Sequence, residues 1–254
     1  WKSPGPHIGE SIMGASNHKM ERLDRASRTG VLSLEDMKLK DVPKEIKTKL
    51  DAGRLRTFSV AGNTIERLPD WITSFVALKT LDLGRNNLSV LMDLSPLTKL
   101  ETLSLRRNRL TTVHPSIFEL RSLKKLDLSS NKLAGVPPEG FGRLRKLWVL
   151  DLSENRLQAL PADCGSLGVE ELNLNGNLLS EISADLAKAS SLRVLRIERN
   201  KIEMAAFPPV LLTESSINLI AFDGNPMTTR QFQAIEGYGK YEARFTASKK
   251  KMGT

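Results

Sequence analysis

Leucines and asparagines recur along this chain at one fixed spacing. The pattern LxxLxLxxNxL begins at Leu55 and returns until a last copy at Ile217, which makes eight copies. An asparagine fills the ninth position of each copy, and successive asparagines lie 22 to 25 residues apart. These asparagines are Asn63, Asn86, Asn108, Asn131, Asn155, Asn177, Asn200 and Asn225. A weaker copy runs from Val31 to Pro43 with Met37 at the asparagine position, so we count nine repeats.

Apolar and polar residues alternate at the centre of each copy, which predicts a short strand. In the segment "TLDLG", Leu81 and Leu83 are expected to point inward, while Thr80 and Asp82 point outward. One such strand cannot bury its apolar side alone. Parallel strands stacked side by side can, and each fully buried leucine is worth roughly 1.5–3 kcal/mol.

The asparagine stands where the chain must turn sharply out of the strand. Such a turn leaves backbone N–H and C=O groups inside the molecule without partners in the sheet. An asparagine side chain carries both a donor and an acceptor, so it can satisfy these groups. We therefore expect the asparagines to form one structural row in the interior, each worth about 1–3 kcal/mol of stability.

With this spacing the chain resembles the leucine-rich-repeat proteins. The resemblance implies an α/β fold, a leucine-rich-repeat solenoid shaped as a curved horseshoe, with short parallel strands on the concave face and helical caps. Nine strands at about 4.8 Å spacing predict a sheet roughly 40 Å long. We expect one domain with an unstructured extension at 1–12, an N-terminal capping segment at 13–30 and repeats at 31–227. A C-terminal capping helix at 228–245 and a basic flexible tail at 246–254 complete this prediction.

The net charge of +9 comes mainly from the two ends of the chain. Residues 13–28 and 240–254 hold most of the basic excess, whereas the middle is nearly balanced. A groove for nucleic acid needs basic residues spread along one face, so we expect no nucleic-acid partner. Cys164 is the only cysteine, which favours a reducing compartment and hence the cytoplasm.

The two ends also resemble a small group of animal leucine-rich-repeat proteins that begin with Met-Gly. The stretches that carry this resemblance are "MGASNHKMERLDRASRTGVLSL" from Met13, "VEELNLNGNLLSEIS" from Val169 and "IEGYGKYEARFTASKKK" from Ile235. The resemblance implies a myristoyl group on Gly14, with Met13 as the initiator. The general acylation motif has Ser or Thr four residues after the glycine, where this chain has His18.

A single myristoyl chain holds a protein on a membrane only marginally, so a second signal is required. Lys249, Lys250 and Lys251 are the candidates for it, since each cation near an anionic surface is worth about 1 kcal/mol. The alternative is that these lysines belong to a solvated tail. The expected location is therefore cytoplasmic, either free or peripheral on the cytoplasmic face of a membrane.

The outward-pointing strand positions form the face that repeat proteins offer to partners. Asp82, Asp127 and Asp151 form an interrupted acidic stripe with arginines beside it, and apolar residues follow towards the C-terminus. A mixed face of this kind suits a protein partner, although any hydrophilic sheet face has a similar composition. The candidate protein-binding residues are Thr80, Asp82, Arg85, Ser104, Arg106, Asp127, Trp148, Val149, Asp151, Val194 and Arg196.

The chain shows no arrangement typical of catalysis, of a metal or of a cofactor. His114 precedes a proline in an expected surface turn, and no histidine is placed to activate Cys164. We therefore expect a monomeric, non-enzymatic intracellular scaffold or adaptor that binds a protein through its concave face. The alternatives are a lipid-anchored protein whose role is membrane association, and a regulatory or substrate-recognition subunit of a phosphatase or ubiquitin-ligase complex.

Overall fold

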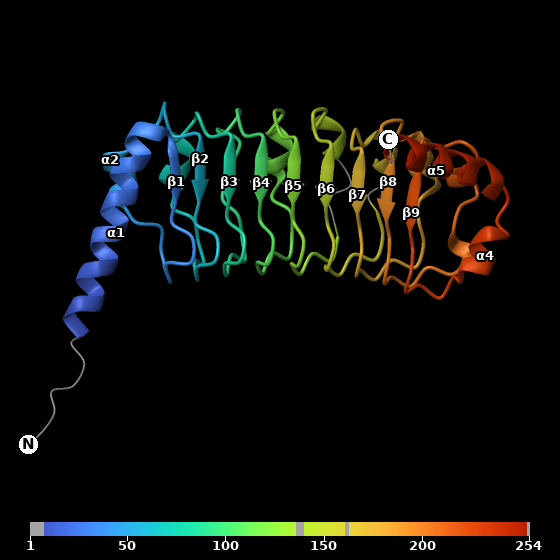
Figure 1. Ribbon diagram of the computed structural model, residues 1–254, viewed down its shortest axis with the longest axis horizontal. Coiled ribbons are helices and arrows are strands. Elements are labelled where there is room, and N and C mark those ends of the chain that lie inside the picture. The colour runs from blue at the N-terminus through green and yellow to red at the C-terminus, as the bar shows by residue number, and fades with distance from the viewer. Residues whose placement is uncertain (1–7, 136–139, 161–162, 253–254) are drawn as a thin grey trace, which may run out of the picture.

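Nine short strands form a single parallel sheet along the length of the molecule (Figure 1). The computed structural model describes residues 8–135, 140–160 and 163–252, with side chains between residues 18 and 250. Within that part the strands pair in chain order. They are β1 (Val31–Ser33), β2 (Thr57–Ser59), β3 (Thr80–Asp82), β4 (Thr102–Ser104), β5 (Lys125–Asp127), β6 (Val149–Asp151), β7 (Glu171–Asn173), β8 (Val194–Arg196) and β9 (Leu219–Ala221).

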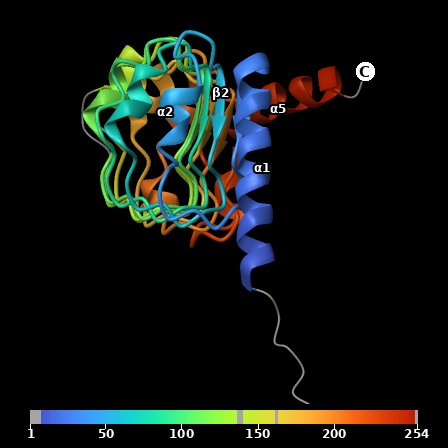
Figure 2. The same ribbon diagram turned by 90° about the vertical axis from the view of Figure 1, so that its left-hand side faces the viewer.

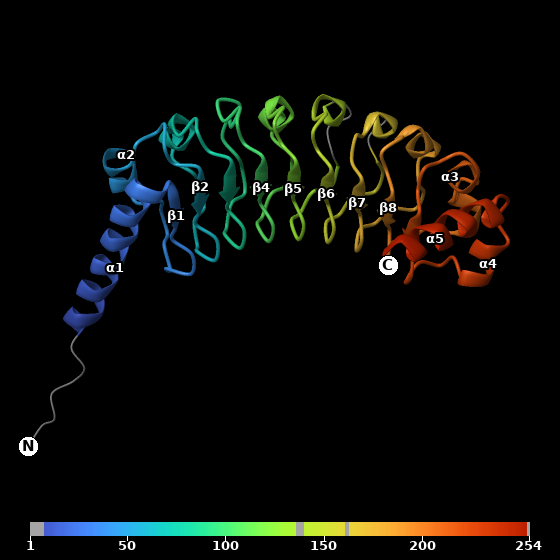
Figure 3. The same cartoon turned by 45° about the horizontal axis from the view of Figure 1, so that its top comes forward.

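The register of the sheet places equivalent residues of neighbouring repeats side by side. Leu81 pairs with Leu103, Leu103 with Leu126, and Leu126 with Leu150. All four are buried in one continuous apolar core. Figure 3 shows the stack bending into an arc with the strands on its inner side. The predicted α/β solenoid with parallel strands on the concave face is confirmed.

A row of asparagine side chains joins the repeats inside this arc. In the central repeat, Nδ2 of Asn131 donates to the carbonyl oxygens of Leu105 and Leu128, both at 3.0 Å. Its Oδ1 accepts the N–H of Leu110 at 3.0 Å. The other seven asparagines make the same three contacts, and all eight except the half-buried Asn225 are buried. Each amide therefore satisfies backbone groups of its own repeat and of the preceding one.

The residue before each of these asparagines adopts the left-handed backbone conformation. Its φ lies between 52° and 77° in all eight repeats. Three of the eight are glycines, and the others are Arg85, Arg107, Ser130, Glu154 and Arg199. A left-handed residue reverses the chain within one step, which brings the following amide into the interior.

The convex side consists of short 3₁₀ and α-helical turns. They are α2 (Glu45–Lys49), η1 (Asp70–Ser74), η2 (Pro115–Glu119), η3 (Phe141–Arg143), η4 (Cys164–Ser166), η5 (Ala184–Lys188), η6 (Met204–Ala206) and α3 (Val210–Thr213). The segment between β3 and β4, all of which the structure describes, contains no helix. In this repeat the convex segment reads "LMDLSPL" and has no proline directly after Leu91.

Helix α1 (Ile8–Thr29) covers the first strand at one end of the stack (Figure 1). Leu23 and Ala26 are buried against the core, and Nη1 of Arg22 donates to the carbonyl oxygen of Ser33 at 2.8 Å. We expected the cap to begin at residue 13, after an unstructured extension at 1–12. The helix instead includes residues 8–12, because each residue added to an existing helix gains one backbone hydrogen bond. Residues 1–7 lie outside the described part.

Two helices, rather than the predicted single one at 228–245, cover the other end. Helix α4 (Thr229–Gln233) begins with a capping box between Thr228 and Gln231. Helix α5 (Tyr238–Met252) follows Gly237, whose φ of 89° separates the two. The end of the sheet is closed by α5, since Oη of Tyr241 accepts the N–H of Ile220 at 3.1 Å and Nε of Arg244 donates to the carbonyl of Ile217.

The flexible tail expected at 246–254 is helical as far as residue 252. Lysines in a last helical turn interact favourably with the negative end of the helix dipole. In addition, Nζ of Lys249 lies 4.6 Å from the centre of the Phe245 ring. Helices α1 and α5 lie at opposite ends of the stack (Figure 1), and both are on the strand side of the coil (Figure 2).

We predict that Asn131→Ala lowers the free energy of unfolding by about 1–3 kcal/mol for the buried backbone groups it leaves unpaired. Asn225→Ala should cost less, because Asn225 is half-buried in the last repeat. Urea denaturation followed by circular dichroism measures both. Equal losses at the two positions, or none at Asn131, would contradict the role of burial.

We also predict that Gly176→Ala destabilises the protein by about 1–2 kcal/mol, because its φ of 64° disfavours any side chain. The control is Gly135→Ala, where an added Cβ meets no atom of the described residues within 4 Å and φ is not positive. This control should change stability by less than about 0.5 kcal/mol. Similar denaturation midpoints for both variants would show that the turn tolerates other conformations.

Candidate protein-binding face

The exposed face of the sheet gathers all the candidate binding residues from the sequence. Thr80, Val149 and Val194 are first residues of their strands, and Asp82, Ser104, Asp127, Asp151 and Arg196 are third residues. Trp148 directly precedes β6, whereas Arg85 and Arg106 lie in the turns after β3 and β4. The register aligns Ser104 with Asp127 and Asp127 with Asp151. We call these exposed strand positions and their flanking residues the concave face.

The aspartates of the stripe are held by their own turns. Oδ1 of Asp127 accepts the backbone N–H and the hydroxyl of Ser129 at 3.0 and 2.6 Å. Oδ1 of Asp151 accepts the same two groups of Ser153 at 2.9 and 2.6 Å. Sequence reasoning missed this structural role, although the repeated Asp-Leu-Ser spacing is typical of side chains that bind the backbone two residues on. Each carboxylate thus keeps one oxygen free of its turn.

Trp148 is the large apolar side chain of this face. It is 46% exposed, and Nζ of Lys125 on the neighbouring strand lies 5.5 Å from its ring centre. A cation over an indole face is attracted by the ring quadrupole. The ring is therefore oriented by a neighbour and still open to solvent, as an anchor for a partner requires.

The apolar column predicted at Val149, Val194 and Leu219 is interrupted. Glu171 stands between Val149 and Val194 in the register, and its Oε1 accepts from Nε of Arg196 at 2.9 Å. The C-terminal half of the face is consequently more polar than its valines suggest. Two adjacent apolar pairs remain, Trp148 with Val149 at the beginning of β6 and Val194 with Leu219 across β8 and β9.

Two ion pairs bridge repeats by passing over a glycine. Nη2 of Arg85 lies 3.2 Å from Oδ2 of Asp36, across the turn that contains Gly62. Arg199 pairs with Glu154 across the turn of Gly176, where a Cβ would lie 2.6 Å from Oε1 of Glu154. In both places, the missing side chain lets charges two repeats apart meet.

Glu101 lies between two lysines where three strands begin. Its carboxylate oxygens are 2.6 Å from Nζ of Lys124 and 3.0 Å from Nζ of Lys79. The hydrogen bonds from Lys124 and Lys79 lower the pKa of Glu101 to about 2. These contacts link the starts of β3, β4 and β5.

The residues considered for chemistry are not brought together. Burial raises the pKa of the Cys164 thiol, which is a buried filler of the convex side. His114, expected on the surface, is half-buried and its Nδ1 accepts the N–H of Ser116 at the start of η2. Among the described residues, no three His, Cys, Asp or Glu side chains are grouped to hold a metal ion.

The predicted lipid signals lie at the two ends of the chain. Gly14 is part of helix α1, and Lys249 and Lys250 are exposed on α5. Lys251 belongs to the same helix, but its side chain is outside the described part. Acylation of Gly14 stays a prediction. In the described part of the chain, no helix combines the length and the apolarity that crossing a bilayer demands.

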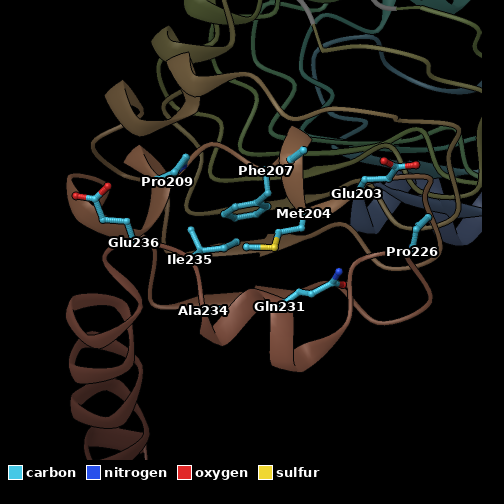
Figure 4. Close-up of a pocket in the computed structure, with 10 residues that line it drawn as sticks. Glu203, Met204, Phe207, Pro209, Pro226, Gln231, Ala234, Ile235 and Glu236 are labelled. Carbon is cyan, nitrogen blue, oxygen red and sulfur yellow. The ribbon is translucent and has the colours of Figure 1, made fainter.

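A separate hollow of about 660 Å³ lies at the C-terminal cap, away from the concave face. Figure 4 shows Phe207 and Ile235 at its centre with Met204 beside them. Glu203 and Glu236 stand at its opposite ends, and Gln231 comes from α4. The hollow holds no nucleophile with an activating base, so it offers an apolar surface rather than chemistry.

We predict that Lys124→Ala raises the pKa of Glu101 from about 2 towards its ordinary value of 4.5. A carboxyl group whose pKa is lower in the folded than in the unfolded protein stabilises the fold at a pH above its unfolded pKa. This stabilisation is lost as the pH falls through the folded-state pKa. The contribution is therefore complete above about pH 4.5 and lost on acidification towards pH 2. Carbon NMR titration of the Glu101 carboxyl group measures its pKa in the wild type and in the variant. Lys99→Ala, an exposed lysine outside any described ion pair, should leave the titration unchanged.

The chain is similar in sequence to several repeat proteins. Leucine-rich repeats and immunoglobulin-like domains protein 3 of Homo sapiens is 32% identical over 133 residues, which are 50% of this chain and 12% of that protein. Podocan-like protein 1 of Mus musculus is 34% identical over 158 residues, which are 60% of this chain and 23% of that protein. Plant intracellular Ras-group-related LRR protein 8 of Oryza sativa subsp. japonica is 30% identical over 46% of this chain and 32% of its own. The chain thus spans about a third or less of these relatives.

Solved structures share the fold. A TDR receptor superimposes with a TM-score of 0.70 and 21% identity, over 89% of this chain and 40% of that one. A second structure is the LRR ectodomain of the plant membrane receptor kinase GASSHO1/SCHENGEN3 from Arabidopsis thaliana in complex with CASPARIAN STRIP INTEGRITY FACTOR 2. It superimposes with a TM-score of 0.60 and 24% identity, over 78% of this chain and 27% of that one. At these identities the likeness concerns the fold alone.

The family model described as leucine rich repeat matches residues 53–110 and 98–157. The closer resemblance of the two ends, to leucine-rich repeat-containing protein 57, is not tested by these relatives and stays a prediction. Proteins built from such repeats are in general protein-interaction modules that use an extended concave surface. The repeat spacing, the parallel sheet and the family model agree that this chain is built from leucine-rich repeats.

Proposed function

We propose that this protein is a non-enzymatic scaffold that binds a protein partner through its concave face. The observation that carries the proposal is Trp148, a 46% exposed indole that Lys125 contacts near the middle of a largely hydrophilic sheet face. Exposed tryptophans surrounded by polar groups are typical anchors of protein interfaces. The neighbouring Asp127 offers one carboxylate oxygen for directional hydrogen bonds, whereas Oδ2 of Asp151 accepts from Nδ2 of Asn173 at 3.1 Å.

The face is also prepared for binding at low entropic cost. Its aspartates are fixed by their turns, and its strands are paired on both sides from β2 to β8. Side chains already held in one position lose little freedom when a partner binds. Support for a binding role therefore comes from rigidity as well as from composition.

We propose the cytoplasm as the site of this activity. Cys164 is the single cysteine of the sequence and it is buried, so the fold draws no stability from internal disulfides. Stability without disulfides suits a reducing compartment. Fractionation of cells that express the full chain tests the location, and recovery in a secreted fraction would contradict it.

We predict that Trp148→Ala weakens capture of a specific partner by about tenfold or more, as expected for an interface anchor. Thr102→Arg, which places a bulky charge on β4, should have a similar effect. The partner is identified by proximity labelling in cells and its affinity is then measured with purified protein. Circular dichroism verifies that both variants fold.

The matched control is Val90→Ala, which removes a 59% exposed apolar side chain outside the strands. It should leave the affinity unchanged. A partner that is insensitive to Trp148→Ala and Thr102→Arg but lost with Val90→Ala would place binding elsewhere on the solenoid.

A further inference from the structure

The charges on the concave face are distributed unevenly along the solenoid. In each repeat, the residue before the strand, the first and third strand residues and the last two residues before the asparagine contribute to this face. Along β2–β5 seven side chains are basic and three acidic: Arg56, Lys79, Arg85, Arg106, Arg107, Lys124 and Lys125, against Asp82, Glu101 and Asp127. Along β6–β9 three are basic and six acidic: Arg193, Arg196 and Arg199, against Asp151, Glu154, Glu170, Glu171, Glu198 and Asp223.

Ion pairs within each half strengthen this contrast. In the basic half, Glu101 forms ion pairs with Lys79 and Lys124. The exposed Arg106 and Arg107 have no ion-pair partner among the described residues. In the acidic half, Arg196 forms an ion pair with Glu171, and Arg199 forms one with Glu154.

Ion pairs thus neutralise Glu101 in the basic half, and Arg196 and Arg199 in the acidic half. The exposed charges outside these pairs are mainly positive along β2–β5, as at Arg106 and Arg107, and mainly negative along β6–β9, as at Glu170 and Asp223. The pair Trp148 and Val149 stands at the beginning of β6, at the boundary between the halves. Helix α5 extends outward from the strand side of the coil rather than along the strands (Figure 2).

We infer that this face binds an extended protein segment in which an acidic stretch and a basic stretch flank one apolar side chain. The acidic stretch lies over β3–β5, the apolar side chain contacts Trp148, and the basic stretch lies over β7–β9. This inference rests on the proposed function and names the partner class. Complementary potentials favour such a segment and repel one with the opposite or a mixed arrangement.

The spacing of the strands sets the spacing within the segment. Neighbouring strands are about 4.8 Å apart, so β4 and β8 each lie about 10 Å from β6. An extended chain advances about 3.3 Å per residue, which places each charged stretch about three residues from the apolar side chain. The peptide EEEGLGKKK has this arrangement, and EKEGLGKEK has the same composition without it.

Fluorescence anisotropy with the purified full chain tests the inference with these two peptides. We expect the first to bind about tenfold tighter than the second, with a difference that shrinks as salt screens the charges. Arg106→Glu with Arg107→Glu, and separately Glu170→Lys with Asp223→Lys, should each remove the preference. All four residues are exposed, so the fold is retained.

The position of each peptide end supplies a second readout. A nitroxide on the acidic end of EEEGLGKKK should broaden the NMR signals of Thr80 and Thr102, and one on the basic end those of Val194 and Leu219. Equal affinity for both peptides, or the same broadening from either end, would overturn the inference. Self-association of the protein that both double variants abolish would assign the face to a second copy of this chain, and would overturn it as well.

These outcomes are distinguishable from failure of the proposed function. A cellular partner that depends on Trp148 but on neither double variant would leave the scaffold role intact and reject the charge arrangement. A preference for EEEGLGKKK that Trp148→Ala leaves unchanged would instead reject the anchor on which the scaffold proposal depends.

Discussion

The buried amide at the end of each strand is the interaction on which the whole architecture depends. A parallel sheet of three-residue strands has few ladder hydrogen bonds of its own, and every repeat must turn out of it at once. Asn131 and its seven equivalents donate to two carbonyls and accept one N–H, so they replace the sheet partners that the turn removes. Two of these three contacts, one carbonyl and the N–H, belong to the preceding repeat. The same side chain therefore closes a turn and fixes the distance between repeats.

An open stack of strands has two unpaired edges, and the molecule closes both with a polar side chain from a helix. At the first strand, Arg22 of α1 donates to a carbonyl of β1. At the last, Tyr241 and Arg244 of α5 satisfy an N–H of β9 and a carbonyl beside it. Free edges invite association with other chains, so these caps leave the face rather than the edges for a partner.

The concave face owes its order to small local arrangements. Aspartates two residues before serines hold their own turns, and glycines in the left-handed turns of Gly62 and Gly176 let ion pairs pass over them. The ion pairs neutralise some of the charges on this face, while other charged side chains stay exposed. As a result, a face with a nearly balanced composition acquires a positive half, a negative half and an indole between them.

The sequence alone determined the repeat, the parallel stack, the direction in which each leucine points and the position of the amides. It could do so because each repeat contacts mainly its neighbours, so a local pattern repeated nine times is also the global fold. Only the tertiary structure decided which charges remain exposed, because Glu154 meets Arg199 from two repeats away. It also decided the extent of the caps, since the helical state of residues 246–252 follows from the packing of α5 around Tyr241 and from Lys249 on Phe245. Those contacts depend on side chains that do not follow the repeat pattern, so they cannot be predicted from the spacing of residues in the sequence.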